Sequence, residues 1–350
     1  PDTFLTLHMH EGLRSELIRN YSINSITLFP SKFFPGVNFG YAGLSIIDIT
    51  NSKPNKDQSF KVFECLSHQE DLPKILESPE IFESYDLTYS DILKTPSKAF
   101  FSKKDEWVVN TLNSSDKSIG DICSVVTGFY SGNDGRFLRR SKSVTRGIKK
   151  YQQIEESEIC LQDLAGLKPL DGIDGEDCWI PIVKGGGRRF HKPDEWFMNW
   201  SLEAIHNYKV ENKKRARFQN SQFYFCYGIG VPMVSSRAIT GAMIDGRLFD
   251  QSIVGIFPKK EYEELLVYLL GFFNSNVCNA LIRTINASTN NSSNYIKKLP
   301  IIIPNRSVIA EVDKIVERLL DKAKKSKIND DDLIEINSVF NNIYSVPNGV

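Results

Sequence analysis

The stretch Trp179–Phe190, which reads WIPIVKGGGRRF, is the most informative part of the 350-residue sequence. Its apolar first half predicts a buried strand, and three consecutive glycines separate that strand from an arginine pair. Glycines lose more conformational freedom on folding than any other residue, so a run of three needs a reason. Trp196 and Trp200 follow. A solvated loop would explain the arginines alone, whereas flexible backbone, paired guanidinium groups and aromatic rings together fit contact with nucleic acid.

A second motif lies upstream, where Gly128 and Gly132 are four residues apart in TGFYSGND, Thr127–Asp134. One interpretation is a hairpin turn. The alternative is a backbone that approaches a ligand closely, because basic residues able to meet phosphates follow at once. Those residues begin at Arg136 and run to Lys150, and a second basic run spans Lys209–Arg217.

The overall composition neither requires nor excludes a nucleic-acid partner. Hydrophobic content of 41% and charged content of 25% are ordinary for a globular chain long enough for two domains. The net charge is zero, which counts mildly against nucleic-acid binding, but neutrality on average can hide a basic face. No run of about 18 apolar residues predicts a membrane span.

The six cysteines occur singly and the five histidines form no ligand pattern. This spacing predicts no metal site, and it favours free thiols in a reducing cytoplasm.

The first 113 residues have the pattern of an α/β sheet with few strands. Helical spacing spans His10–Arg19, and strand patterns follow at Ser25–Phe29, Leu44–Ile49 and Phe60–Cys65. Two more helical stretches lie at Leu72–Leu76 and Tyr89–Leu93. The glycine pair of Asn38–Gly43 opens a strand instead of a helix, so it is a connection and not a cofactor loop. These strands are too few to close a core of their own.

Short strands, glycines and aromatic residues mark the rest of the chain. A polar stretch at Asn113–Lys117 predicts the boundary. Apolar stripes predict long helices at Lys259–Asn274 and Ser307–Lys325. We therefore expect domains at 1–113, 114–306 and 307–350.

Several of these blocks resemble N6-adenine DNA methyltransferases of the type IIG restriction–modification kind and those of BREX phage-defence systems. Gly128–Phe137 resembles the entry to the family's TaqI-like target recognition domain. The segments that resemble later blocks, in order, are Lys184–Trp200, Gly228–Asp250, Leu269–Asn276 and Asn286–Pro300; Ala287 stands where the family tends to have proline. Gly12–Ile47 resembles the late strands of the methyltransferase domain. The resemblance covers nearly the whole chain.

The resemblance implies a fold and an activity. The fold would be the α/β remnant of a Rossmann-like methyltransferase sheet, followed by an α+β target recognition domain with long C-terminal helices. The parent enzyme would recognise double-stranded DNA and methylate adenine with S-adenosylmethionine. The family's glycine-rich cofactor loop and Asn-Pro-Pro-Tyr motif are absent here and would precede Pro1, in a missing N-terminal catalytic half. Other restriction or phage-defence subunits are further expected partners.

No catalytic residue is therefore expected in this chain, and the predicted site is a DNA contact. Arg188 and Arg189 are the expected base readers. Arg136, Arg139, Arg140 and Lys142 are expected to contact phosphates, with Lys184 and Arg215 as further candidates. The remaining members of the predicted site are Gly128, Ser131, Asn133, Gly186 and Trp196. Two alternatives stay open: a stand-alone specificity subunit, and a protein-interaction domain without DNA contact.

The isolated chain is expected neither to bind S-adenosylmethionine measurably nor to methylate DNA, because it lacks both motifs. Calorimetric titration with the cofactor measures this directly. Binding in the micromolar range would contradict the expectation.

Overall fold

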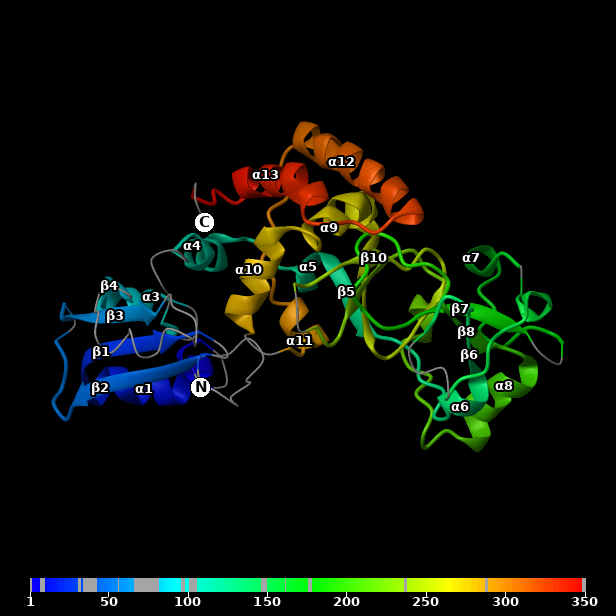
Figure 1. The fold of residues 1–350 in the computed structure, drawn as a ribbon, viewed down its shortest axis with the longest axis horizontal. Coiled ribbons are helices and arrows are strands. Elements are labelled where there is room, and N and C mark those ends of the chain that lie inside the picture. The colour runs from blue at the N-terminus through cyan, green and yellow to red at the C-terminus, as the bar shows by residue number, and fades with distance from the viewer. Residues whose placement is uncertain are drawn as a thin grey trace.

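The computed structural model describes residues 2–6, 10–30, 33, 43–55, 57–65, 82–95, 98–100, 106–145, 150–160, 162–175, 178–235, 238–286 and 289–347. Three bodies lie in a row along the long axis of the molecule (Figure 1). We call them the N-terminal body, residues 2–100; the central body, which contains both C-terminal helices; and the distal body, built mainly from residues 128–227.

The N-terminal body is a four-stranded sheet in the order β2-β1-β3-β4. β1 pairs antiparallel with β2 and parallel with β3, and β3 pairs antiparallel with β4. The strands are β1 Ser22–Phe29, β2 Leu44–Thr50, β3 Ser59–Cys65 and β4 Phe82–Thr88. The helices are a 3-10 turn at Asp2–Leu5, α1 Glu11–Asn20 and α3 Tyr89–Lys94.

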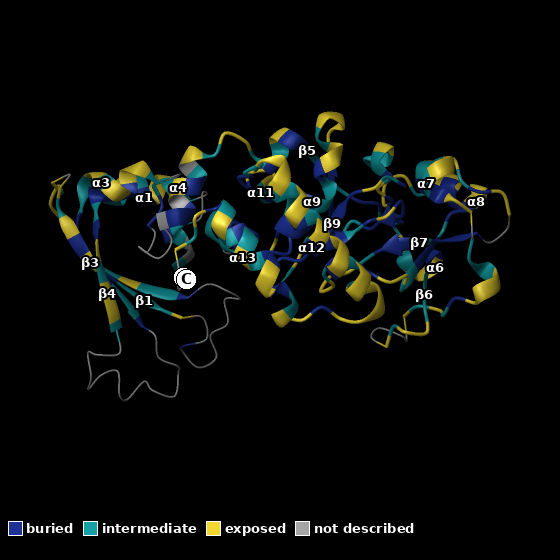
Figure 2. Cartoon of the chain, turned by 90° about the horizontal axis from the view of Figure 1, so that it is seen from above, coloured by how far each residue is buried: buried dark blue, intermediate teal, exposed yellow. Residues whose placement is uncertain are grey.

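α1 and α3 lie on the same side of this sheet (Figure 2). Ile26, Phe60 and Val62 point toward them and are buried. On the opposite side Ile46, which is 61% exposed, lies opposite Thr27 in the register of β1 and β2. Buried Arg14 joins α1 to its neighbours, because its guanidinium donates to the carbonyls of Phe4 and Lys98. One face of the sheet is therefore packed, while the other shows apolar surface.

The central body packs helices against an antiparallel sheet in the order β10-β9-β12-β5. Its strands are β5 Cys123–Thr127, β9 Ile229–Pro232, β10 Ala242–Met243 and β12 Ile253–Pro258. Its helices are α4 Glu106–Ser114, α5 Ile119–Ile122, α9 Leu266–Phe272, α10 Asn276–Ile285, α11 Ser293–Ile296, α12 Arg306–Lys325 and α13 Ile334–Ile343, with 3-10 segments at Lys260–Leu265 and Asp331–Leu333.

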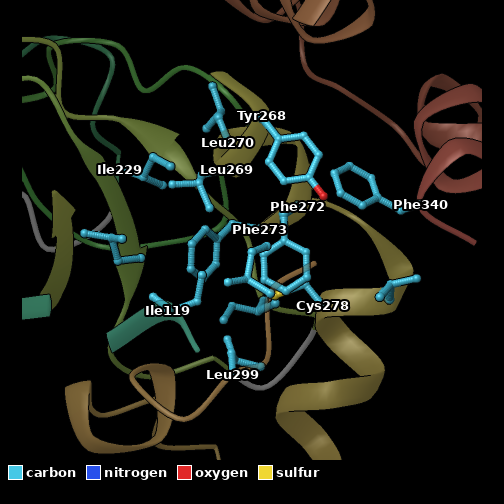
Figure 3. Packing of buried hydrophobic residues seen from close by; sticks show 14 of the residues in the cluster. Ile119, Ile229, Tyr268, Leu269, Leu270, Phe272, Phe273, Cys278, Leu299 and Phe340 are labelled. Atoms are coloured by element: carbon cyan, nitrogen blue, oxygen red, sulfur yellow. The ribbon is translucent and has the colours of Figure 1, made fainter. Parts of the chain in front are cut away.

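α9 supplies much of the central core, as Figure 3 shows. Tyr268, Leu269 and Phe272 are buried there, and the Tyr268 and Phe340 rings lie 5.4 Å apart. Val312 and Ile315 of α12 belong to the same cluster. α12 and α13 are thus integral parts of the central core.

The distal body holds a third sheet in the order β11-β7-β8-β6, with β11 and β7 parallel and the other pairs antiparallel. Its strands are β6 Leu138–Arg140, β7 Trp179–Val183, β8 Trp196–Asn199 and β11 Leu248–Phe249. Its helices are α6 Asp134–Phe137, α7 Leu164–Leu167 and α8 Leu202–His206, with a π-helical turn at Asn207–Glu211 and 3-10 turns at Glu156–Glu158 and Ser221–Phe223. Phe129, Trp200 and Tyr208 pack edge-to-face or tilted in its core.

Most helices and strands that the sequence predicts are present. The strands near residues 25, 44 and 60 and the helices near residues 10, 89 and 307 form with ends shifted by a few residues. The helix expected at Lys259–Asn274 instead begins as a 3-10 segment and becomes α-helical at Leu266. In the 3-10 part Leu265 alone is buried, so the periodic apolar face that stabilises an α-helix starts only in α9. Leu72–Leu76 and most of Asn38–Gly43 lie outside the described residues.

The fold is mixed α/β with several small sheets. A Rossmann-like origin for the first sheet remains a proposal, since β1–β3 is its one parallel pair among the described strands. The domain limits at 113 and 306 also remain proposals. Trp107 and Val108 of α4 belong to the central core, and so do the helices after residue 306.

In the part of the chain that the structure describes, no single helix is long and apolar enough to cross a membrane. Two consecutive helical segments, Lys260–Phe272 and Asn276–Ile285, reach the required length and apolar composition only when they are taken together. The angle between them is 87°.

The N-terminal body is expected to open more readily than the central body, because its cluster of buried hydrophobic residues is much smaller. Amide hydrogen exchange of the whole chain, read by mass spectrometry, should show β1–β4 exchanging faster than β9 and β12. Equal protection of the two sheets would contradict this.

Candidate nucleic-acid interface

The three glycines form a loop that directly follows β7, and each glycine is explained by its geometry. Gly185 and Gly187 adopt positive φ angles of 71° and 86°, a region that side chains disfavour. A Cβ on Gly186 would lie 2.7 Å from the ring of Pro232. No hydrogen bond between described residues engages the backbone amides of Gly186 and Gly187. We call Gly185–Gly187 the glycine loop; it presents free backbone donors at the surface.

Two hollows flank the glycine loop and share Gly186, Pro232 and Val234 as lining residues. The larger, which we call the loop groove, has a volume of about 890 Å³ and separates the glycine loop from the turn after α12. The smaller, of about 340 Å³, is bounded by Arg217, Gln219 and Gln251, among other residues. Val234 is strongly exposed between them.

The two arginines after the glycine loop differ in their exposure and in how strongly a carboxylate engages them. Arg188 is exposed and lies 3.7 Å from the Glu195 carboxylate, beyond hydrogen-bond distance. Arg189 is mostly covered and donates to the Asp330 carboxylate at 2.8 Å, while its Nε is buried without a hydrogen-bond partner among the described residues. Arg188 is therefore the more available of the two for a bidentate contact.

Lys184, the residue before the glycine loop, is the centre of a largely buried ion-pair triad. Its Nζ donates to Asp250 at 2.8 Å and to Asp134 at 3.1 Å. Burial by desolvation disfavours the charged amine, but the charges of Asp250 and Asp134 outweigh that effect and raise the pKa of Lys184. Because the amine is engaged by these two carboxylates, Lys184 is not available to contact a phosphate, contrary to the expectation from the sequence.

Behind the glycine loop lies a second buried amine, that of Lys192. Its Nζ is 3.6 Å from the position that a Cβ on Gly185 would take. Burial lowers the pKa of Lys192 to about 8, against the opposing effect of Glu195. The backbone of Gly185 thus lies beside a lysine amine whose charge is disfavoured by burial.

The Gly128–Asn133 motif turns out to serve the fold. Gly128 lies against protein backbone, since a Cβ there would come 2.1 Å from the Phe249 carbonyl oxygen. Ser131 is fully buried and donates to Asp134. Asn133 caps α6 by accepting from the Arg136 amide. Gly128 and Ser131 therefore position the triad instead of facing a ligand, while Asn133 is exposed.

In the basic run after Asn133, some side chains contact neighbouring residues and others are exposed without a partner among the described residues. Arg139 lies 4.4 Å above the Trp179 ring. Arg140 donates to the carbonyls of Tyr151 and Ser141. Lys142 is exposed and has no partner within the described residues.

Arg136 and Trp196 also lie at the surface with contacts of their own. Arg136 is exposed and pairs with Glu203 at 3.3 Å. Trp196 packs edge-to-face on Tyr151, with ring centroids 5.2 Å apart.

Two parts of the predicted site come together through Glu195. The Ser141 amide donates to the Glu195 carbonyl at 2.8 Å, and the Glu195 carboxylate faces Arg188. The turn that carries Lys142 is thereby placed beside the Arg188 side of the glycine loop. The second basic run, in which Lys213, Lys214 and Arg215 are exposed, lies next to Gly132.

The sequence did not indicate the residues that complete the site from positions far away in the chain. Asp250 is 66 residues from Lys184, and Asp330 is 141 residues from Arg189. Pro232, Val234 and Lys327 line the loop groove and also lie far from the glycine loop in sequence. No local pattern in the sequence identifies these pairings.

Three comparisons relate the chain to other proteins. No protein-family model matches it. It is 30% identical over 177 residues to the adenine-specific methyltransferase BrxX of Escherichia coli O9:H4 (strain HS), a match that covers 48% of this chain and 14% of that protein. The chain therefore corresponds to a small part of this relative. A chain from the crystal structure of the type IIG restriction endonuclease BpuSI aligns with 99% of this chain and 46% of its own length, at 12% identity and a TM-score of 0.36, which is too low to carry an argument.

Replacement of Lys184 with alanine is expected to lower the free energy of unfolding by about 3 kcal/mol, because two buried carboxylates would lose their counter-charge. The pKa of Lys184 is raised in the folded state. Its contribution is therefore complete below the unfolded lysine pKa of about 10.4 and is lost as the pH rises through the higher folded value.

Denaturant unfolding at pH 7 measures the effect, with the exposed Lys142→Ala as the matched control, expected to change stability by less than about 0.5 kcal/mol. A loss below about 1 kcal/mol for Lys184→Ala would show that the triad is not an important support.

Proposed function

We propose that this chain is the DNA-recognition part of an adenine-N6 DNA methyltransferase that belongs to a restriction–modification or phage-defence system. The observation that carries the proposal is the glycine loop, which presents free amides and the exposed Arg188 between two hollows. The methyltransferase named as a relative supports the choice of enzyme class.

The chemistry of the loop suits double-stranded DNA. Backbone amides and exposed basic side chains commonly bind phosphate oxygens, which fixes the protein on the duplex without reading its sequence. Exposed Lys142, on the turn beside Arg188, and Arg215 are the candidates from the predicted site that the structure leaves without partners among the described residues. Arg136 is a further candidate, because its exposed pair with Glu203 is weak.

Base reading is assigned first to Arg188. A guanidinium group that reaches the O6 and N7 atoms of guanine discriminates that base by roughly 1–3 kcal/mol. Arg189 could take the same role only by leaving Asp330. Asp330 is 91% exposed, so this pair is screened by solvent and a DNA acceptor could replace it at small cost.

The chemical step belongs to the intact enzyme in this proposal. S-adenosylmethionine would bind to the part of the enzyme that carries the cofactor loop, and this chain would position the adenine-containing site for it. A cytoplasmic location follows from a DNA substrate, and other restriction or defence subunits would be further partners.

The test compares two single substitutions in selection of duplexes from a random-sequence library by the whole chain. Arg188→Ala is expected to relax the preference at one base position by about 5- to 150-fold, the equivalent of 1–3 kcal/mol. Lys142→Ala should instead weaken all duplexes alike and reduce the salt dependence by about one unit. Lys314→Ala, exposed on α12 and outside both hollows, is the control.

Two results would count against the proposal. If the chain binds no duplex at low salt, where even non-specific binding is strong, DNA recognition itself is wrong. If Arg188→Ala keeps the full sequence preference, the assignment of the glycine loop to base reading is wrong.

A further inference from the structure

The loop groove has two walls, and they come from regions far apart in the sequence. One wall contains Gly186 and Gly187 of the glycine loop, Arg188 and Arg189, together with Pro232 and Val234. The other contains Ala323, Ser326, Lys327, Ile328, Asn329 and Asp330, at the end of α12 and in the turn that follows it. Figure 1 shows this end of α12 beside β10, over the junction of the central and distal bodies.

The second wall is held rigidly. Ile328 is buried in the central core. The carboxylate of Asp332 accepts from the Asn329 amide at 3.0 Å and pairs with Lys322. The Asn329 side chain in return accepts from the Asp332 amide at 3.0 Å. The turn therefore presents its remaining side chains to the groove in a fixed arrangement.

The charges of the two walls leave the groove electropositive. The acidic Asp330 is neutralised by Arg189 across the groove. Lys322 and Lys324 at the end of α12 pair with Asp332 and Asp321. Lys327 lines the groove, is exposed and makes no ion pair or hydrogen bond with described residues.

One neighbouring side chain adds no charge at neutral pH. Burial, with a smaller effect of Arg247, lowers the pKa of His191, so this lining residue is neutral. The charge in the groove that no described carboxylate pairs is therefore that of Lys327. Arg188 at the opposite wall is paired with Glu195 at 3.7 Å, without a hydrogen bond. Free amides of the glycine loop and the Asn329 and Ser326 side chains add uncharged polar groups.

We propose that the turn after α12 forms the second wall of the DNA-binding surface, and that Lys327 pairs with a phosphate of a backbone strand lying in the loop groove. This inference rests on the proposed function and extends it to the C-terminal segment, for which the sequence predicts a long helix and no DNA contact. The DNA would then touch the central and distal bodies at once.

The Asp330 carboxylate is expected to oppose DNA binding, whereas the Lys327 amine is expected to favour it. Asp330 is an anion on the surface that the phosphate would approach, and it also occupies the guanidinium of Arg189. Removal of its charge should therefore strengthen binding, whereas removal of the Lys327 charge should weaken it. A substitution that merely disturbed the fold would not strengthen binding.

The experiment measures binding of the whole chain to a mixed-sequence duplex by fluorescence anisotropy over a range of salt concentrations. Lys327→Ala is expected to weaken binding of all duplexes and to reduce the salt slope by about 0.9, the value for one phosphate contact. Asp330→Asn is expected to tighten binding severalfold. Lys314→Ala, on α12 and outside the loop groove, is expected to change neither quantity.

The outcomes separate this inference from the proposed function. If the unmodified chain binds duplexes and Arg188→Ala alters base preference, but Lys327→Ala behaves like Lys314→Ala, the second wall is wrong and DNA recognition stands. If Asp330→Asn weakens binding, the groove does not hold the phosphate strand and the inference is likewise overturned. If the unmodified chain binds no duplex at low salt, both proposals fall.

Discussion

The ion-pair triad of Lys184, Asp134 and Asp250 is the constraint on which the proposed DNA-binding surface depends. It joins the first turn of α6, the end of β7 and the residue after β11 at one point. The glycine loop starts at the next residue, so its backbone begins from a fixed position. A loop with free amides binds a ligand well only when its ends are held, because an unanchored loop must be ordered on binding.

The proposed recognition surface lies where the central and distal bodies meet. The hydrophobic cores of the central and distal bodies are separate, yet β12 and the glycine loop bring them together. The residues that line the loop groove come from three chain regions, at 186–191, 232–240 and 323–330. Its width therefore depends on how the end of α12 is seated on the central core, where Ile328 and Val316 are buried.

The features that could be predicted from the sequence are those that depend on residues close together in the chain. Alternating apolar residues predict β3, and the i, i+4 stripe predicts α12, because burial of one face determines each pattern. The glycine loop is likewise visible from the need for positive φ at Gly185 and Gly187. Partners such as Asp330 could not be predicted, since an exposed aspartate in a helix-to-helix turn has no sequence mark. Lys184 was expected to contact phosphate because its partners, Asp134 and Asp250, lie far from it in the sequence.

One edge of the first sheet has a consequence for handling the protein. β2 is an outer strand in the described sheet order, and its sequence LSIIDIT carries a single charge and no proline. Natural edge strands usually avoid pairing with other molecules through lysines, prolines or bulges. With Ile46 and Ile49 also exposed, this strand offers unpaired backbone groups and apolar side chains together. Concentrated samples of the chain should thus associate edge to edge through β2. The substitution Ile46→Lys is expected to prevent this association.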